Sequence, residues 1–173
     1  MAASAFPRVA LYFENSILKP DIALLAASSA VVSSFRQDRP GAVSTVDSPA
    51  GVELTWHGGG ALVDGKPWPF LSKNNIILPA GPHRVTTAPS RDAITVTDLN
   101  ATLLTAEASD TQAAFRYRSD SRAIAIFDRK PTTLAVDGQA FPVSCVKSSA
   151  PETPDCAILL PRGEHNVTAR DAN

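Results

Sequence analysis

One sequence pattern occurs twice in this chain, and this internal repeat limits the possible folds more than any other feature. Residues 61–86 contain V-D-G near their start and end in L-P-A-G-P-H-R-V-T, whereas residues 134–168 contain V-D-G and end in L-P-R-G-E-H-N-V-T. Asp-Gly tolerates the positive φ values of a tight hairpin turn, and Pro-x-Gly is a second turn signal between two apolar runs. Each copy is therefore predicted to form a β meander.

Short alternating segments separated by turn signals extend beyond the repeat itself. The pattern predicts six short strands between residues 42 and 87 and six more between residues 113 and 169, with two further alternating runs at 93–97 and 102–106. So many short strands favour β-sandwich packing. We expect a mainly β chain with tandem small, immunoglobulin-like β-sandwich modules; a single larger sandwich built from both copies is the alternative.

The N-terminal part of the sequence has a different pattern. Residues 8–14 form an apolar run typical of a buried strand, and apolar positions from residue 22 to residue 35 can share one side of a helix that ends near residues 36–40. The apolar run at 22–32 is too short to cross a bilayer. We therefore expect a strand-helix unit at residues 1–41, a first β module at 42–92 and a second at 93–173, with no membrane span.

Charge excludes one class of partner. The formal net charge is −1, and no run of Lys or Arg is longer than the pair Arg129-Lys130. Proteins that bind nucleic acids or anionic membranes carry a basic patch, which this sequence lacks. The sequence also contains no Gly-rich phosphate loop and no metal-ligand spacing, so no cofactor and no metal are predicted.

Two cysteines, Cys145 and Cys156, bracket the insertion that makes the second copy of the repeat longer than the first. A disulfide between them would join the ends of neighbouring strands and would reduce the entropy of the unfolded loop by roughly 2–3 kcal/mol. Such a bond favours an extracellular or periplasmic location. The alternative is two free, half-buried thiols in a cytosolic protein.

The histidines and the repeated aspartates have structural explanations. His83 and His165 occupy equivalent places after the Pro-x-Gly turns, where a ring that packs on the turn or hydrogen-bonds its backbone explains both. Asp64 and Asp137 are predicted to form the hairpin turns. His57 precedes three glycines, and no Ser or Asp around it has the spacing of a nucleophile motif.

Glu14 is the one carboxylate with a catalytic alternative. It follows an apolar strand and precedes the predicted helix, which is where α/β barrels place catalytic groups. Glycoside hydrolysis needs a second carboxylate facing the same bond, and the sequence does not identify one. We therefore predict no catalytic residue in this chain.

Trp56 and Trp68 are the candidate glycan-binding residues, because carbohydrate-binding sandwiches stack sugars on exposed aromatic rings. Trp68 lies between two prolines in a hairpin arm and is predicted to be partly exposed. The competing explanation is that both rings belong to the core, where aromatic side chains bury much of the available area.

The pattern V-D-G followed by L-P-x-G-x-H-x-V resembles the small PEGA-like and immunoglobulin-like β modules of bacterial envelope and extracellular proteins. It also looks like the β-sandwich appendages at the C-termini of bacterial glycoside-hydrolase-like proteins. This resemblance covers residues 61–87 and 134–169, and it implies non-catalytic binding or spacer elements to which no functional residue carries over.

Three functions follow as expectations. The first is a non-catalytic accessory region of a larger bacterial protein, which binds glycan or holds neighbouring domains apart. The second is the C-terminal part of a glycoside-hydrolase-like enzyme whose catalytic barrel lies upstream. The third is a structural module that pairs with other proteins through exposed strand edges.

Overall fold

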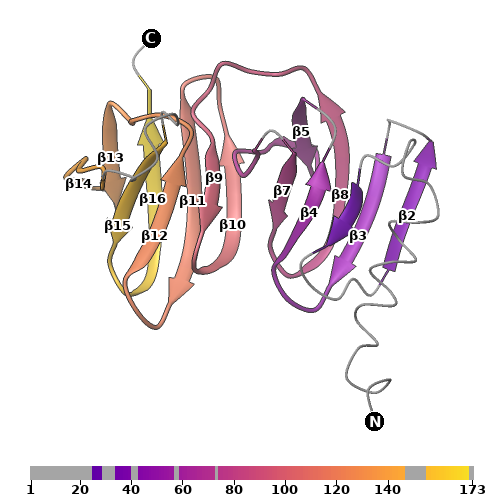
Figure 1. Ribbon diagram of the computed structural model, residues 1–173, viewed down its shortest axis with the longest axis horizontal. Coiled ribbons are helices and arrows are strands. Elements are labelled where there is room, and N and C mark those ends of the chain that lie inside the picture. Colours follow the sequence, from indigo (N-terminus) through magenta and orange to yellow (C-terminus); the bar gives the residue numbers. More distant parts are fainter. Residues whose placement is uncertain are drawn as a thin grey trace.

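The computed structural model describes six stretches of the chain, residues 25–28, 34–39, 43–56, 59–72, 74–146 and 155–171. Sixteen β-strands and no helix occur in these stretches, and the strands form four antiparallel sheets (Figure 1). The predicted mainly β fold is therefore confirmed. The same residues contain no helix that is long and apolar enough to cross a membrane.

The first eight strands form one three-stranded and one five-stranded sheet. The order in the first sheet is β1-β4-β7, and the order in the second is β2-β3-β8-β5-β6. Their bounds are β1 Leu25–Ser28, β2 Ser34–Arg39, β3 Val43–Ser48, β4 Val52–Trp56, β5 Gly60–Val63, β6 Lys66–Pro67, β7 Asn75–Leu78 and β8 Gly81–Ala88.

The last eight strands repeat this topology strand by strand. The three-stranded sheet has the order β9-β12-β15 and the five-stranded sheet the order β10-β11-β16-β13-β14, so each strand corresponds to the strand eight places earlier. Their bounds are β9 Val96–Leu99, β10 Thr102–Ala108, β11 Gln112–Ser119, β12 Ala123–Phe127, β13 Thr133–Val136, β14 Gln139–Phe141, β15 Cys156–Leu160 and β16 Gly163–Arg170. The internal repeat thus includes whole eight-stranded units, which we call the first and second sandwich.

The predicted N-terminal helix is wrong over its described residues. Leu25–Ser28 is strand β1, which pairs with β4, and Ser34–Arg39 is strand β2, which pairs with β3. Helix propensity is a small energetic term even in this Ala-rich segment, and pairing with the edges of two sheets overrides it. The described residues of this segment therefore belong to the sheets of the first sandwich. The strand expected at residues 8–14 lies outside the described residues.

The two Asp-Gly turns have the predicted geometry. Asp64 and Gly65 have φ values of 53° and 81°, and Asp137 and Gly138 have φ values of 51° and 77°. Two successive residues with positive φ define the two-residue turn whose twist matches that of the flanking strands. The turns connect β5 to β6 and β13 to β14, which are equivalent places in the two sandwiches.

Side chains alternate along the inner strands, and their buried faces join into one core. Trp56, Phe70 and Ile76 are fully buried in the first sandwich, and Tyr117 and Phe127 are fully buried in the second. Buried residues from both sandwiches belong to one continuous hydrophobic cluster. The two sandwiches therefore share a core across their boundary.

Backbone and side-chain contacts accompany this shared core. Val96 N–H of β9 donates to Pro69 O at 2.8 Å, and Phe70 O accepts from Ile77 N–H of β7 at 3.2 Å. The segment around Pro69 thus lies between β7 and β9. In the other layer, β6 contacts β10, where Lys66 Nζ lies 2.9 Å from Glu107 Oε2. Both layers are consequently bridged where the first sandwich meets the second.

Candidate functional site

A cleft lies where the two sandwiches meet and has a volume of about 790 Å³. Its walls come from β5, from the segment between β6 and β7, from the connection between β8 and β9, and from the ends of β12 and β15. Sites at the boundary of two structural units are common places for ligands. Its lining includes the side chains of Trp68, Ser72, Asn74, Asn75, Ser90, Arg91, Thr95, Thr97, Asp128 and Asp155, which can form hydrogen bonds.

Asp128 is a carboxylate of this cleft whose orientation is fixed by hydrogen bonds. Its Oδ1 accepts the Thr95 N–H at 2.9 Å, while its own N–H donates to Thr95 O at 3.0 Å. Burial raises the pKa of Asp128 above its ordinary value, although the Thr95 N–H and the neighbouring Arg129 act in the opposite direction. A half-buried carboxylate with a fixed orientation can accept hydrogen bonds from a polar ligand.

Arg129 holds the connection between the sandwiches in place. Its Nη1 lies 2.8 Å from Asp92 Oδ1, and its Nε lies 3.1 Å from Asp171 Oδ2, just after β16. The hydrogen bond to Asp92 is the main reason why the pKa of Arg129 is raised. Arg91, the neighbour of Asp92, also pairs with Asp110 of the second sandwich at 3.0 Å. The 89–95 connection is therefore attached to the second sandwich by two arginines.

The predicted exposure of Trp68 is wrong. Only 7% of its surface is exposed, and its Nε1–H donates to Ile77 O at 2.8 Å. The chain on either side of Trp68 runs between β7 and β9, and the ring belongs to the core while also lining the cleft. Trp56 is fully buried on the inner face of β4. Neither ring offers the open face that sugar stacking requires.

An Asp–His pair occurs at the same place in both sandwiches. His83 Nδ1 lies 2.8 Å from Asp64 Oδ2, and His165 Nδ1 lies 2.7 Å from Asp137 Oδ2. In each copy the other carboxylate oxygen accepts the backbone N–H of the residue after the histidine. The repeated aspartates therefore form the hairpin turn and also fasten it to the neighbouring strand β8 or β16.

The two pairs differ in their second ring nitrogen. His165 Nε2 lies 2.9 Å from Arg162 O, so both of its ring nitrogens face acceptors. The hydrogen bond to Asp137, followed by that to the Arg162 carbonyl, raises the pKa of His165, and the same histidine lowers the pKa of Asp137. The buried Nε2 of His83 has no partner among the described residues. In the second copy both ring nitrogens can donate hydrogen bonds at once, which favours the imidazolium form of His165.

Tyr117 packs beside this second pair. It stands opposite His165 in the ladder, and the two ring centroids lie 5.8 Å apart. Its hydroxyl donates to Pro161 O at 2.5 Å, and burial together with the charge of Asp137 raises its pKa to about 12. Val46 occupies the equivalent position opposite His83. Hydrogen bonds to backbone carbonyls thus give Tyr117 and His165 a structural role.

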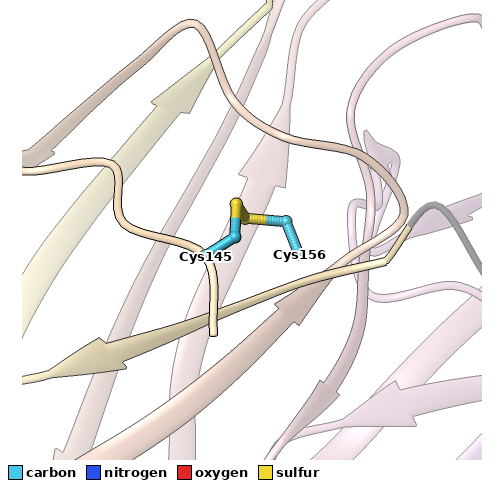
Figure 2. The surroundings of a disulfide bond; sticks show 2 residues. All are labelled: Cys145 and Cys156. Carbon is cyan, nitrogen blue, oxygen red and sulfur yellow. A yellow bond between two sulfur atoms is a disulfide. The ribbon is translucent and has the colours of Figure 1, made fainter. Parts of the chain in front are cut away.

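Cys145 and Cys156 form the predicted disulfide, with their Cα atoms 5.0 Å apart (Figure 2). Cys156 begins β15, and Val146 N–H donates to Ala157 O at 2.8 Å beside the bond. The disulfide therefore closes the base of the insertion, as its position in the sequence indicated.

The remaining sequence candidates do not form a reaction centre in the described residues. Glu14 and His57 lie outside these residues. Within them, no group of three or more His, Cys, Asp or Glu side chains is arranged to hold a metal ion. The second ring nitrogen faces the Arg162 carbonyl in His165 and has no hydrogen-bond partner among the described residues in His83, so neither meets the hydroxyl or thiol that a nucleophilic mechanism requires.

No family model, curated protein or solved structure matches this sequence. Functional conclusions therefore depend on the chain's own geometry.

Sequence reasoning missed Asp128 and Arg129, and it missed the second role of the repeated aspartates. Asp128 and Arg129 follow β12 without any motif that marks them. The Asp–His pairs had a usable signal, because both residues recur at the same turns of the two copies, although they are 19 residues apart in the first copy and 28 in the second. When two polar residues recur together in both copies of a repeat, and both lie at turns, a contact between them is indicated.

Proposed function

We propose that this chain is a non-catalytic accessory region of a larger bacterial protein, in which two joined β-sandwiches act as a rigid spacer. One observation carries this proposal: Phe70 of the first sandwich contacts Phe115 of the second edge to face, inside a core that both share. Tandem modules joined by a free linker move independently by default, whereas a large apolar interface holds them in one orientation.

The short connection adds to this argument. Residues 89–95 are fastened by the ion pairs of Arg91 and Arg129, and Val96 immediately bonds to Pro69 O. Each exposed ion pair alone contributes little. Together with the shared core they leave the connection little freedom to act as a hinge.

Residual dipolar couplings test the spacer function. Backbone amide couplings measured in a weakly aligning medium should fit one alignment tensor for both sandwiches of the described structure. Two different tensors, one for each sandwich, would show independent motion and would contradict a rigid spacer. A variant with a flexible Gly-Ser insertion after Ser90 tests whether the measurement detects movement.

A second candidate is binding of a glycan in the cleft between the sandwiches. Its volume and its mixture of Asn, Thr, Arg and carboxylate groups suit a small polyhydroxylated ligand, which is recognised mainly by directed hydrogen bonds. The cleft, and not an exposed tryptophan face, supports this candidate. Asp128 and Asn75 are the residues proposed to accept and donate those hydrogen bonds.

Titration with a panel of oligosaccharides, followed by amide chemical shifts, tests this candidate. Shifts should concentrate at Thr95, Thr97 and Asn75, and Asp128→Asn should weaken binding because the neutral side chain is a poorer acceptor. Asp120→Asn, on an exposed turn outside this cleft, is the matched control. Unchanged spectra across the panel would contradict glycan binding, and the spacer function would then be the only remaining candidate.

We further propose an extracellular or periplasmic location and a neighbouring domain of the same protein as partner. The Cys145–Cys156 bond supports the location, because disulfides persist in oxidising compartments. The partner follows from the resemblance to appendages of glycoside-hydrolase-like proteins. Mass spectrometry of unreduced peptides from the native protein should show the bond; two free thiols there would contradict the location.

A further inference from the structure

The outer side of β12 and β15 carries an apolar surface. The two strands are neighbours in the second sandwich (Figure 1), and alternate residues along each strand point away from the core. The side chains on this side form what we call the outer face: Ile124, Ile126, Ala157, Leu159 and Val146, which bridges to Ala157. The three exposed large apolar side chains among the described residues, Ile124, Val146 and Leu159, all belong to it. Apolar side chains gathered in this way are typical of an interaction site.

The first sandwich provides an internal comparison for this face. Its strands β4 and β7 are equivalent to β12 and β15 and pair in the same register. In the second sandwich Ile124 faces Leu159 and Ile126 faces Ala157, where the first sandwich has the pairs Glu53 with Ile77 and Thr55 with Asn75. Three of these four positions are thus polar in the first copy. The fold does not require apolar side chains there, so those of the second copy indicate a covering partner.

Charges of opposite sign mark the two ends of the outer face. Arg122 directly precedes β12 and Arg162 follows shortly after β15, and both lie at the same end because the two strands are antiparallel. Asp128 directly follows β12 and Asp155 directly precedes β15, so they lie at the other end. Each of the two strands therefore has an arginine at one end and an aspartate at the other.

The arginines are available to another molecule. Arg122 and Arg162 are exposed, and neither forms an ion pair within the part of the chain that the structure describes. Asp155 at the opposite end is exposed as well. The first sandwich has Gly51 and Ala80 at the places of Arg122 and Arg162. The charged ends, like the apolar side chains, therefore distinguish the second copy from the first.

This charge pattern selects the partner and its orientation. Two copies of the outer face can pack on each other about a twofold axis that runs either along the strands or across them. An axis along the strands sets the arginine end of one copy on the arginine end of the other. An axis across the strands reverses their direction and sets each arginine end on an aspartate end. Since opposite charges attract and like charges repel, the face is complementary to itself in the second orientation alone.

We propose that the outer face is a dimerisation surface, on which a second copy of this chain packs about a twofold axis across the strands. Arg162 of each copy then lies beside Asp155 of the other, and Arg122 beside Asp128. The apolar side chains fill the space between the two sheets, as in a sandwich core. A twofold contact uses the same surface on both copies, so the association ends at a dimer. This inference goes beyond the proposed spacer function, which holds for a monomer and a dimer alike.

Sedimentation velocity from micromolar to millimolar concentration tests the proposal on the oxidised full chain. The average mass should rise with concentration and level off at that of a dimer. Ile124→Glu should raise the dimer dissociation constant roughly tenfold or more, because it buries an unpaired carboxylate in the apolar contact. The fold accepts this side chain at the equivalent position, Glu53.

Ala140→Glu is the matched control, because it adds the same charge at an exposed position of β14, in the other sheet of the second sandwich. It should leave the dimer dissociation constant unchanged. A monomer at every concentration, growth of the mass beyond a dimer, or equal effects of the two variants would overturn the proposal.

A charge reversal tests the orientation of the two copies. Arg162→Asp and Asp155→Arg should each weaken the dimer roughly two- to fivefold, as expected for exposed ion pairs. The double variant should restore the wild-type dissociation constant, because each reversed residue again meets an opposite charge on the other copy. Circular dichroism of the three variants checks that they are folded. Folded variants whose effects add in the double variant would overturn the proposed contact.

Discussion

Phe70 and Phe115 meet edge to face across the boundary of the two sandwiches, with ring centroids 5.2 Å apart and an interplanar angle of 88°. This arrangement sets the positive rim of one ring against the negative face of the other, which is favoured over face-to-face stacking. Both side chains are buried, Phe70 completely. The contact joins two units that each have their own sheets, so the stability of one unit depends on the other.

Phe115→Ala should destabilise the whole chain by about 3–5 kcal/mol, because it removes a buried ring from the shared core and leaves a cavity. Urea denaturation followed by far-UV circular dichroism measures this loss. Phe141→Ala is the control: the same truncation at Phe141, which is only partly buried, should cost clearly less. Equal decreases in unfolding free energy for the two variants would contradict a stabilising contact at the boundary of the sandwiches.

The His165–Asp137 pair predicts a pH dependence. The pKa of His165 is raised by its bond to Asp137, so its contribution to stability is complete below the unfolded-state pKa of about 6.5 and is lost as pH rises through the folded pKa. The pKa of Asp137 is lowered, so its contribution is present above the unfolded value of about 3.9 and is lost as pH falls through the folded value.

Comparison of the wild type with His165→Gln checks the part of this pH dependence that comes from His165. The difference in unfolding free energy between the two proteins should be largest between about pH 3.9 and about pH 6.5, where both contributions are present. It should shrink as pH rises through the folded pKa of His165. A histidine NMR titration should give a value for His165 above the ordinary one. An ordinary or lowered value would contradict the pairing.

The disulfide should stabilise the chain by about 2–3 kcal/mol through its effect on the unfolded loop. We expect the double variant Cys145→Ala, Cys156→Ala to unfold at lower denaturant concentration than the oxidised protein. A reducing agent should shift the wild type in the same direction and leave the double variant unchanged, which makes that variant the control. No shift on reduction would contradict a stabilising bond.

Gly65→Ala and Gly138→Ala should each cost about 1–2 kcal/mol, because both positions have positive φ, which strains an L side chain. No atom lies within 4 Å of an added Cβ at either glycine, so the expected loss comes from backbone strain and not from a clash. Gly51→Ala, where φ is ordinary and the nearest atom is 3.6 Å away, is the control. Thermal unfolding of the three variants measures the difference.

Features encoded by neighbouring residues could be predicted from the sequence. The Asp-Gly dipeptide specifies its turn locally, and the alternation in residues such as Ala123–Phe127 specifies which side chains face the core. Cys145 and Cys156 were paired correctly because an insertion in one copy of a repeat has two nearby ends.

Features decided by distant contacts could not be predicted. The composition around Leu25 predicts a helix, whereas pairing with β4 makes this segment a strand. The flanking prolines predict partial exposure of Trp68, yet the next residue, Pro69, accepts Val96 N–H of β9 and the ring is buried in the core. Neither Phe70 nor Phe115 carries a local sign that it contacts the other.

Scanning calorimetry of the oxidised chain tests the shared core most directly. If the two sandwiches are one cooperative unit, a single transition should appear, with the calorimetric enthalpy equal to the van't Hoff enthalpy. Two separable transitions, or a calorimetric enthalpy about twice the van't Hoff value as two equal independent units give, would contradict a core that joins Phe70 to Phe115.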